Sequence, residues 1–253
     1  MRVVVVGGTG LVGSQLVCGL TEFGHEAVAA APQTGVNTIT GEGLPEVLEG
    51  TDVVVDVSNS PSFADAAVME FFTTATTNVL AAAAAAGVGH HVALSVVGTD
   101  RLARQSGYFK AKLVQENLIR ESPVPFSIVR ATQFFEFVTS IAASATEGDT
   151  VRLSPALIQP MASADVAEAV AIAAVGAPSA GITEVAGPDR YGLDELIRDA
   201  LQFRGDPRTV VADSAARYWG AELSERMLLP GDGAVLFETR FADWVRETPA
   251  AVR

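Results

Sequence analysis

Short, unbroken hydrophobic runs recur along the chain and alternate with longer stretches of helical periodicity. Residues 3–6 are four valines, and residues 53–57 are again all apolar except for Asp56. A run of β-branched residues without polar alternation predicts a strand buried on both faces, as in a parallel sheet. The same reasoning predicts further strands at 26–31, 91–95 and 126–130, and shorter ones near 151–153 and 183–185.

Helices are predicted between these strands, over residues 11–23, 44–48, 63–86, 108–121, 132–145, 164–175, 193–203 and 241–246. The helix over 63–86 contains six successive alanines, whose high helix propensity and small volume favour close packing on a sheet. Strands that alternate with helices predict an α/β fold with a doubly wound parallel sheet. No repeat, low-complexity linker or Pro/Ser-rich boundary divides the chain.

The first strand leads directly into a glycine-rich turn made of Gly7, Gly8, Thr9, Gly10, Leu11, Val12 and Gly13. Glycines at this spacing allow a tight turn, a close approach of the backbone to a diphosphate, and close packing of helix on strand. The N–H groups of the new helix then point at the anion. A turn without a ligand is the alternative, but the position between an N-terminal strand and a helix favours a nucleotide site.

Composition narrows the class of protein. Hydrophobic residues make up 49% of the chain, so it is expected to fold, and its net charge of −13 argues against binding DNA or an anionic membrane through the overall field. The single cysteine, Cys18, excludes an internal disulfide and suits a reducing cytoplasm. The apolar stretches 3–20 and 71–99 are interrupted by glycines and by polar residues, so we expect a soluble cytoplasmic protein.

Tyr108 and Lys112 stand four positions apart at the start of a predicted helix and therefore share one face. The chain has two lysines, Lys110 and Lys112, against fifteen arginines, which indicates a site where a compact ammonium is required. A nearby cation favours the phenolate, so Tyr108 can exchange a proton with a substrate oxygen near neutral pH. Lys112 can also bond a nicotinamide ribose, and Ser95, at the end of its strand, can polarise the same substrate oxygen.

Structural explanations exist for each of these residues. The pair of Tyr108 and Lys112 is also compatible with an exposed helix face, and Ser95 with a small residue that closes a buried strand. His90 and His91 are adjacent on a strand and point to opposite faces, and no cysteine or carboxylate is spaced to join them. We therefore expect a structural role for both histidines and no metal site.

The order of these motifs resembles the short-chain dehydrogenase/reductase superfamily, and most of all its atypical, NmrA-like NAD(P)H-binding branch. The resemblance covers nearly the whole chain and includes GGTGLVG (7–13), YFKAKLVQENLIRES (108–122), FSIVRATQFFEF (126–137), SADVAEAV (163–170) and VAGPDRYGLDEL (185–196). It implies one Rossmann-type NAD(P)-binding domain over 1–253, in which a C-terminal substrate portion is interleaved over roughly 131–253.

By this resemblance the glycine-rich turn would surround the pyrophosphate, and Ser58 and Asn59 would pass the middle of the cofactor. Thr132 and Phe134 would lie near the nicotinamide, and Ser95, Tyr108 and Lys112 would form the catalytic triad. Many members carry an Asn in the helix before the Ser strand as part of a proton relay. Here Asn78 aligns with a different position and Phe72 falls near the relay position, which argues against a water-based relay.

The exit of the second strand, residues 31–34, lacks the carboxylate that would bond an NAD ribose and the Arg that commonly holds a 2′-phosphate. Gln33 and Thr34 remain able to donate hydrogen bonds there, and we favour NADP(H) over NAD(H) as the cofactor.

The predicted function is an NAD(P)H-dependent oxidoreductase that reduces or oxidises a small, mostly apolar carbonyl or quinone compound, with hydride from nicotinamide and a proton from Tyr108. Candidates for an apolar lining are Phe134, Phe135, Phe137, Met161, Tyr218 and Trp219, each equally compatible with a core position. The alternatives are a redox-sensing NAD(P)-binding regulator without turnover, and an epimerase or dehydratase with no net redox change. The expected partner is a small-molecule substrate, with no nucleic acid or membrane, and self-association is left open.

Overall fold

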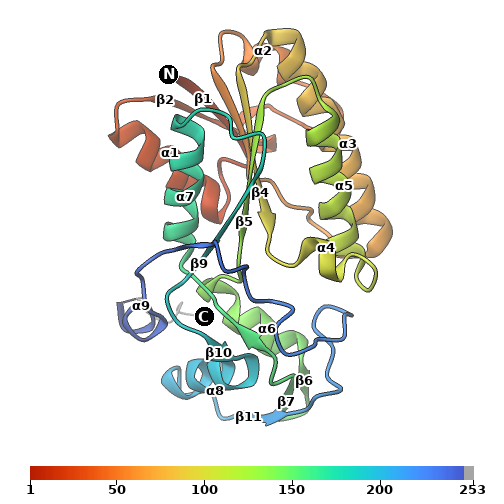
Figure 1. The fold of residues 1–253 in the computed structure, drawn as a ribbon, viewed down its shortest axis with the longest axis vertical. Coiled ribbons are helices and arrows are strands. Elements are labelled where there is room, and N and C mark those ends of the chain that lie inside the picture. The colour runs from red at the N-terminus through yellow and green to blue at the C-terminus, as the bar shows by residue number, and fades with distance from the viewer. Residues whose placement is uncertain (248–253) are drawn as a thin grey trace. The chain divides into compact units, whose positions relative to one another are not determined.

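The computed structural model describes residues 1–247 and contains a seven-stranded sheet flanked by helices (Figure 1). Its strands are β1 (Arg2–Val6), β2 (Glu26–Ala30), β3 (Val53–Asp56), β4 (His90–Val96), β5 (Phe126–Ala131), β9 (Ile182–Ala186) and β12 (Val235–Leu236). They lie in the order β2-β1-β3-β4-β5-β9-β12, which confirms the predicted α/β fold. After β1 the chain adds β2 on one side and β3 on the other, so the strand order reverses at β1, where open parallel sheets bind their ligands.

The chain divides into two compact units, each of which is described by itself. The first contains Met1–Ala131 and Val166–Thr183, and the second contains Thr132–Asp165 and the chain from Glu184 onward.

The helices of the first unit are α1 (Leu11–Glu22), α2 (Leu44–Leu48), α3 (Asp65–Ala86), α4 (Thr99–Leu102), α5 (Gly107–Glu121) and most of α7 (Ser163–Val175). Helices α3 and α5 lie side by side on one face of the sheet, and α1 and α7 cover the other (Figure 1). Because helices cover both faces, the valines of β1 and β3 are buried on both sides, which explains their unbroken apolar runs.

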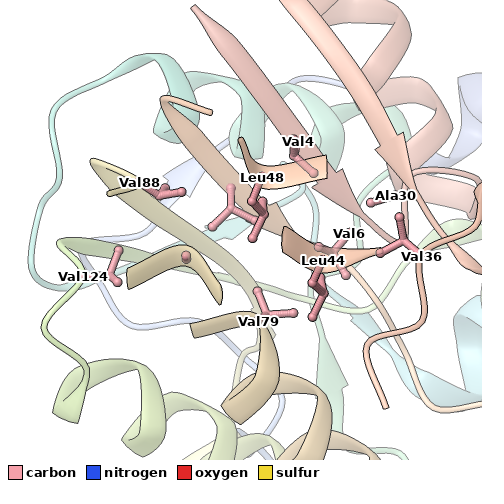
Figure 2. Packing of buried hydrophobic residues seen from close by; sticks show 11 residues of the cluster. Val4, Val6, Ala30, Val36, Leu44, Leu48, Val79, Val88 and Val124 are labelled. Carbon is pink, nitrogen blue, oxygen red and sulfur yellow. The ribbon is translucent and has the colours of Figure 1, made fainter. Parts of the chain in front are cut away.

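The core under α2 and α3 is built from branched and small side chains. Figure 2 shows Val4 and Val6 of β1 facing Leu44 and Leu48 of α2, with Val79 of α3 closing the cluster. Complete burial of a Val or Leu side chain contributes about 1.5–3 kcal/mol. The six successive alanines of α3 differ in burial. Ala83 is fully buried in this cluster, while its neighbours on the helix are partly or fully exposed.

The second unit contains a three-stranded sheet in the order β11-β7-β6 and a short antiparallel pair of β8 and β10. Its strands are β6 (Thr146–Glu147), β7 (Thr150–Leu153), β8 (Leu157–Ile158), β10 (Tyr191–Gly192) and β11 (Thr209–Ala212). Its helices are α6 (Val138–Ser144), α8 (Leu193–Phe203) and α9 (Phe241–Glu247). The buried residues of α8 recur at helical spacing, which gives this helix one apolar face.

The predicted helix over 132–145 is wrong in its first half. Residues 135–137 form a single 3-10 turn, and α6 begins only at Val138. The backbone before it pairs instead with a distant segment: Met161 N donates to Gln133 O at 2.9 Å, and Phe135 N donates to Met161 O at 2.9 Å. These long-range bonds hold the segment extended despite its helix-compatible sequence.

Candidate functional site

The glycine-rich turn leaves no room for side chains at the carboxyl end of β1. A Cβ on Gly13 would lie 2.2 Å from Gly7 O, and a Cβ on Gly8 would lie 2.7 Å from the Cα of Ala29 in β2. Gly7 has a φ of +79°, and a Cβ there would also meet the Cα of Ser58, after β3, at 2.8 Å. The turn is therefore pressed against the backbone of both neighbouring strands, and glycine alone fits at these positions.

Helix α1 begins without a side-chain cap. Its N-cap residue is Gly10, its first turn contains no acidic residue, and it is twelve residues long. The turn before it is held by its own backbone, since Gly7 N donates to Ala30 O at 2.9 Å and Gly10 N donates to Gly7 O at 3.0 Å. The positive end of the helix dipole and the first N–H groups are thus suited to a phosphate group.

The exit of β2 meets the glycine-rich turn through side chains. Thr9 Oγ1 donates to Gln33 Oε1 at 3.4 Å, and both residues are exposed. The Thr34 hydroxyl accepts from Ala31 N at 2.9 Å and lies 3.0 Å from Ala31 O, so it stabilises the 3-10 turn Pro32–Thr34. Of the two expected donors, Gln33 therefore stays accessible and Thr34 is engaged locally.

The exit of β3 is organised by a buried carboxylate. Asp56 is 2% exposed, and its Oδ1 accepts from Ser58 N at 2.9 Å and from Ser58 Oγ at 2.6 Å. The next residue, Asn59, is exposed, and its side-chain oxygen accepts from Ser60 N at 3.0 Å. The structure thus brings Ser58 against the glycine-rich turn and leaves Asn59 at the surface.

Tyr108 lies in the first turn of α5 and is held by aromatic rings. Its ring centroid is 5.7 Å from that of Phe63 and 6.1 Å from that of Phe72. The preceding residue, Gly107, allows α5 to approach α3 closely, because a Cβ there would lie 2.1 Å from Asp65 Oδ1. The phenol is therefore fixed between the beginnings of two helices.

Lys112 is charged but only 3% exposed. Its Nζ donates to Leu94 O at 2.8 Å and to the side-chain oxygen of Gln115, and it lies 4.5 Å from the centroid of the Phe72 ring. Burial lowers the pKa of Lys112 to about 8, although the negative charges of Asp56 on β3 and of Glu116 on α5 oppose the change.

Ser95 is buried at the end of β4 and is bonded to a buried ion pair. Its Oγ donates to Glu116 Oε1 at 2.6 Å. Glu116 also accepts two bonds from Arg130, at 2.9 and 2.8 Å, and Arg130 reaches Asp100 at 3.1 Å. The hydroxyl proton of Ser95 is thus directed at a carboxylate, so it would have to leave this bond to polarise a substrate oxygen, and that role stays a prediction.

Thr132 belongs to the second unit, where its N–H donates to Val185 O at 3.2 Å and its hydroxyl donates to Gln159 O at 2.6 Å. Its neighbour Gln133, which the sequence analysis did not select, is 6% exposed, and neither polar atom of its amide has a partner among residues 1–247. Such a desolvated amide is costly unless it meets water or a ligand. Its place directly after β5 was the one available signal in the sequence.

The apolar lining candidates of the second unit fall into three groups. Phe135 and Met161 are buried, and Phe135 packs against Phe241 with ring centroids 5.3 Å apart, as core residues do. Phe134 and Phe137 instead form a stacked pair with centroids 5.2 Å apart, and Phe137 is exposed. Tyr218 and Trp219 form an edge-to-face pair in a loop.

The two histidines are buried in β4. His90 Nε2 lies 2.9 Å from Ser127 Oγ, whereas both ring nitrogens of His91 lack a partner in the described part of the chain. Burial lowers the pKa of His91 to about 4, so the ring is neutral. Within residues 1–247 no three His, Cys, Asp or Glu side chains gather as metal ligands, and no helix there has the length and apolar character needed to cross a bilayer.

No protein-family model matches the chain. A (4-alkanoyl-5-oxo-2,5-dihydrofuran-3-yl)methyl phosphate reductase from Streptomyces griseus is 29% identical over 223 residues, which cover 81% of this chain and 74% of that protein. Similar solved structures include WbmH of Bordetella bronchiseptica in complex with NAD+, with a TM-score of 0.72, 15% identity, and 96% and 95% of the two chains covered.

A dTDP-4-dehydrorhamnose reductase from Clostridium acetobutylicum has a TM-score of 0.70 and 16% identity, over 93% of this chain and 95% of that one. A Thermus thermophilus UDP-glucose 4-epimerase in complex with NAD has a TM-score of 0.69 and 17% identity, over 90% and 92%. At these identities the structural likeness shows a common Rossmann-type fold.

Two glycines of α1 offer a matched test of the turn. Gly13→Ala should lower the free energy of unfolding by about 1–3 kcal/mol, since its methyl group would overlap backbone atoms. Gly19→Ala, where a Cβ meets nothing within 4 Å, should be neutral or stabilise by up to about 1 kcal/mol. Urea denaturation measures both values, and equal effects would contradict the close approach seen in the structure.

The buried ion pair at Ser95 gives a second test. Glu116→Gln replaces the buried carboxylate that faces the Arg130 guanidinium by a neutral amide and should cost about 3–5 kcal/mol of unfolding free energy. Asp100→Asn removes an exposed partner of the same guanidinium and should cost about 1 kcal/mol or less. Chemical denaturation measures the free energy of unfolding of both variants. A Glu116→Gln protein as stable as the Asp100→Asn protein would refute the buried ion pair of Glu116 and Arg130.

Proposed function

We propose that the chain is an NAD(P)H-dependent oxidoreductase of the short-chain dehydrogenase/reductase type. The observation that carries the proposal is the glycine-rich turn, which meets β2 and β3 where the strand order reverses and opens into an uncapped helix. Tyr108 and Lys112 lie in the same unit. The relative from Streptomyces griseus is named a reductase, and solved structures with this fold contain bound NAD, both of which support the proposal.

The residues at the turn fit a dinucleotide. A Cβ on Gly7, Gly8 or Gly13 would collide with neighbouring backbone, so glycine keeps the turn in this shape, and the first amides of α1, from Leu11 and Val12, would hold the diphosphate. Ser58 and the exposed Asn59 would lie along the middle of the cofactor. When bound, the nicotinamide would supply or accept the hydride.

We favour NADP(H) on the chemistry of the β2 exit. Residues 31–34 contain no carboxylate that would repel a 2′-phosphate, and Gln33 offers an exposed amide beside Thr9. The amide adds hydrogen-bond donors without adding negative charge. It can therefore bond the oxygens of a 2′-phosphate, whereas a ribose diol is commonly bonded by a carboxylate, which is absent here.

Tyr108 is proposed as the proton donor in the reductive direction. As the carbonyl carbon receives the hydride, the carbonyl oxygen takes the phenolic proton, and the phenolate is then reprotonated from solvent. The positive charge of Lys112, four residues further along α5, stabilises the phenolate. The proposed substrate is a mostly apolar carbonyl or quinone compound, and the stacked aromatic pair of Phe134 and Phe137 is the observation that supports its apolar character.

Removal of the phenolic hydroxyl tests this role. Tyr108→Phe should reduce NADPH-dependent turnover of a panel of quinones and aromatic ketones by about 100-fold or more, because proton donation is lost. The Kd for NADPH should stay within about twofold. Absorbance at the NADPH band and calorimetry give the two readouts, with Tyr191→Phe as the control that loses a hydroxyl elsewhere.

A turnover rate unchanged in Tyr108→Phe would remove this residue from the mechanism. Tight binding of NADPH without turnover of any probe would favour a redox-sensing regulator, and turnover without net cofactor change would favour an epimerase.

The cofactor preference has its own test. Gln33→Asp should weaken NADPH binding at least tenfold, about 1.4 kcal/mol, because the new carboxylate faces the 2′-phosphate. NADH binding should stay equal or improve, since the carboxylate can accept bonds from the ribose hydroxyls. Calorimetric titration measures both, with the exposed Gln202→Asp as control. Equal losses for both nucleotides would place the 2′-position away from Gln33.

A further inference from the structure

Lys112 is held by a chain of buried groups that leads to the exit of β3. Gln115 follows it at i+3 on α5 and is 1% exposed. Its side-chain oxygen accepts from Lys112 Nζ, and its Nε2 donates to Asp56 Oδ2 at 3.1 Å. The second oxygen of Asp56 is occupied by Ser58. Because a carboxylate accepts only from the NH2 end of an amide, Asp56 fixes which end of Gln115 faces Lys112.

No other side chain performs this task. In the described part of the chain, Gln115 is the one side chain to which Lys112 Nζ donates a hydrogen bond, the second acceptor being the Leu94 carbonyl. Phe72 stands near the position of the relay Asn of similar proteins and presents a ring, which cannot hold a water by lone pairs. Asn78, on the same helix, donates to backbone oxygens of residues 38 and 39 at 2.9 and 3.0 Å.

The carboxylates near Lys112 make their hydrogen bonds to other groups. Asp56 of β3 acts through the Gln115 amide, and Glu116 of α5 is paired with Arg130 of β5. His91 of β4 is neutral, and α3 contributes the Phe72 ring. A direct carboxylate would hold the ammonium strongly, whereas the amide positions it and leaves its proton labile.

We propose that Gln115, oriented by Asp56, is the positioning residue that holds the Lys112 ammonium beside Tyr108 and links it to Ser58 at the β3 exit. Phe72 supports the placement, since its ring contacts both Tyr108 and Lys112. The role toward Tyr108 rests on the proposed function, while the hold on Lys112 is a property of the protein without any ligand.

The scarcity of lysine makes this hold directly measurable. The full chain contains only Lys110, which is exposed, and Lys112, which is buried. Protein labelled with [ε-13C]lysine therefore gives two side-chain resonances, and NMR titration of each yields its pKa without substrate or cofactor. The resonance of the exposed Lys110 serves as an internal control. The pKa of Lys112 is expected to be about 8.

Two substitutions should move the Lys112 pKa in opposite directions. Gln115→Met removes the acceptor at nearly the same volume and should lower it by about half a unit or more, because the charged form loses a hydrogen bond. Gln115→Glu replaces the amide by a carboxylate and should raise it by about one unit. Asn117→Met, an exposed amide on the same helix, should move neither lysine.

Opposite shifts support the proposal, and a loss of packing alone would not produce them. If Gln115→Met does not fold, Asp56→Asn gives the second test and should lower the Lys112 pKa by removing the anion. Absence of a shift, or shifts of one sign in both Gln115 variants, would overturn the proposal.

A kinetic readout separates this proposal from the proposed function. With NADPH and a quinone as probes, kcat should fall as pH rises through the Lys112 pKa, because the ammonium is lost there. That alkaline limb should lie at lower pH in Gln115→Met and at higher pH in Gln115→Glu. Lysine shifts without any NADPH oxidation would leave the positioning role intact and refute the oxidoreductase.

Discussion

The absence of side chains where β1 turns into α1 is the constraint on which the rest of the candidate site depends. Any Cβ at Gly7 or Gly13 would collide with backbone, so the turn lies directly against the neighbouring strand exits and the start of its own helix. The helix that follows has Gly10 as its N-cap, so its first amides receive no side-chain cap and are suited to an anion. Glycine thus meets two requirements in this turn, the close approach of backbone segments and a helix start without a side-chain cap.

The face of the sheet beneath α5 shows how this fold carries charge in its interior. Asp56, Lys112, Glu116 and Arg130 are each at least nine-tenths buried, yet every one of them is hydrogen-bonded. Buried charges persist only with such partners, because an unpaired one would cost several kcal/mol. These side chains come from the last residue of β3, from near the end of β5, and from α5, which follows β4.

Features that depend on local sequence were predictable, and features that depend on distant partners were not. Unbroken valine runs gave the central strands, and the apolar periodicity of Leu193–Phe203 gave a helix with the bounds observed. The segment after β5 was predicted as a helix from its local sequence. Its extended form depends on hydrogen bonds to Met161, far along the chain, and the local sequence does not indicate them. Gln115 resembles any polar residue on a helix until Asp56, 59 positions earlier, is seen to orient it.

A crystal structure of the protein soaked with NADPH would test the central claim most directly, since it locates the diphosphate and the nicotinamide together. The account predicts diphosphate oxygens at about 3 Å from the N–H groups of Leu11 and Val12, and the nicotinamide ribose within reach of Tyr108 and Lys112. A nucleotide bound elsewhere, or a glycine-rich turn that stays empty under saturating NADPH, would contradict it.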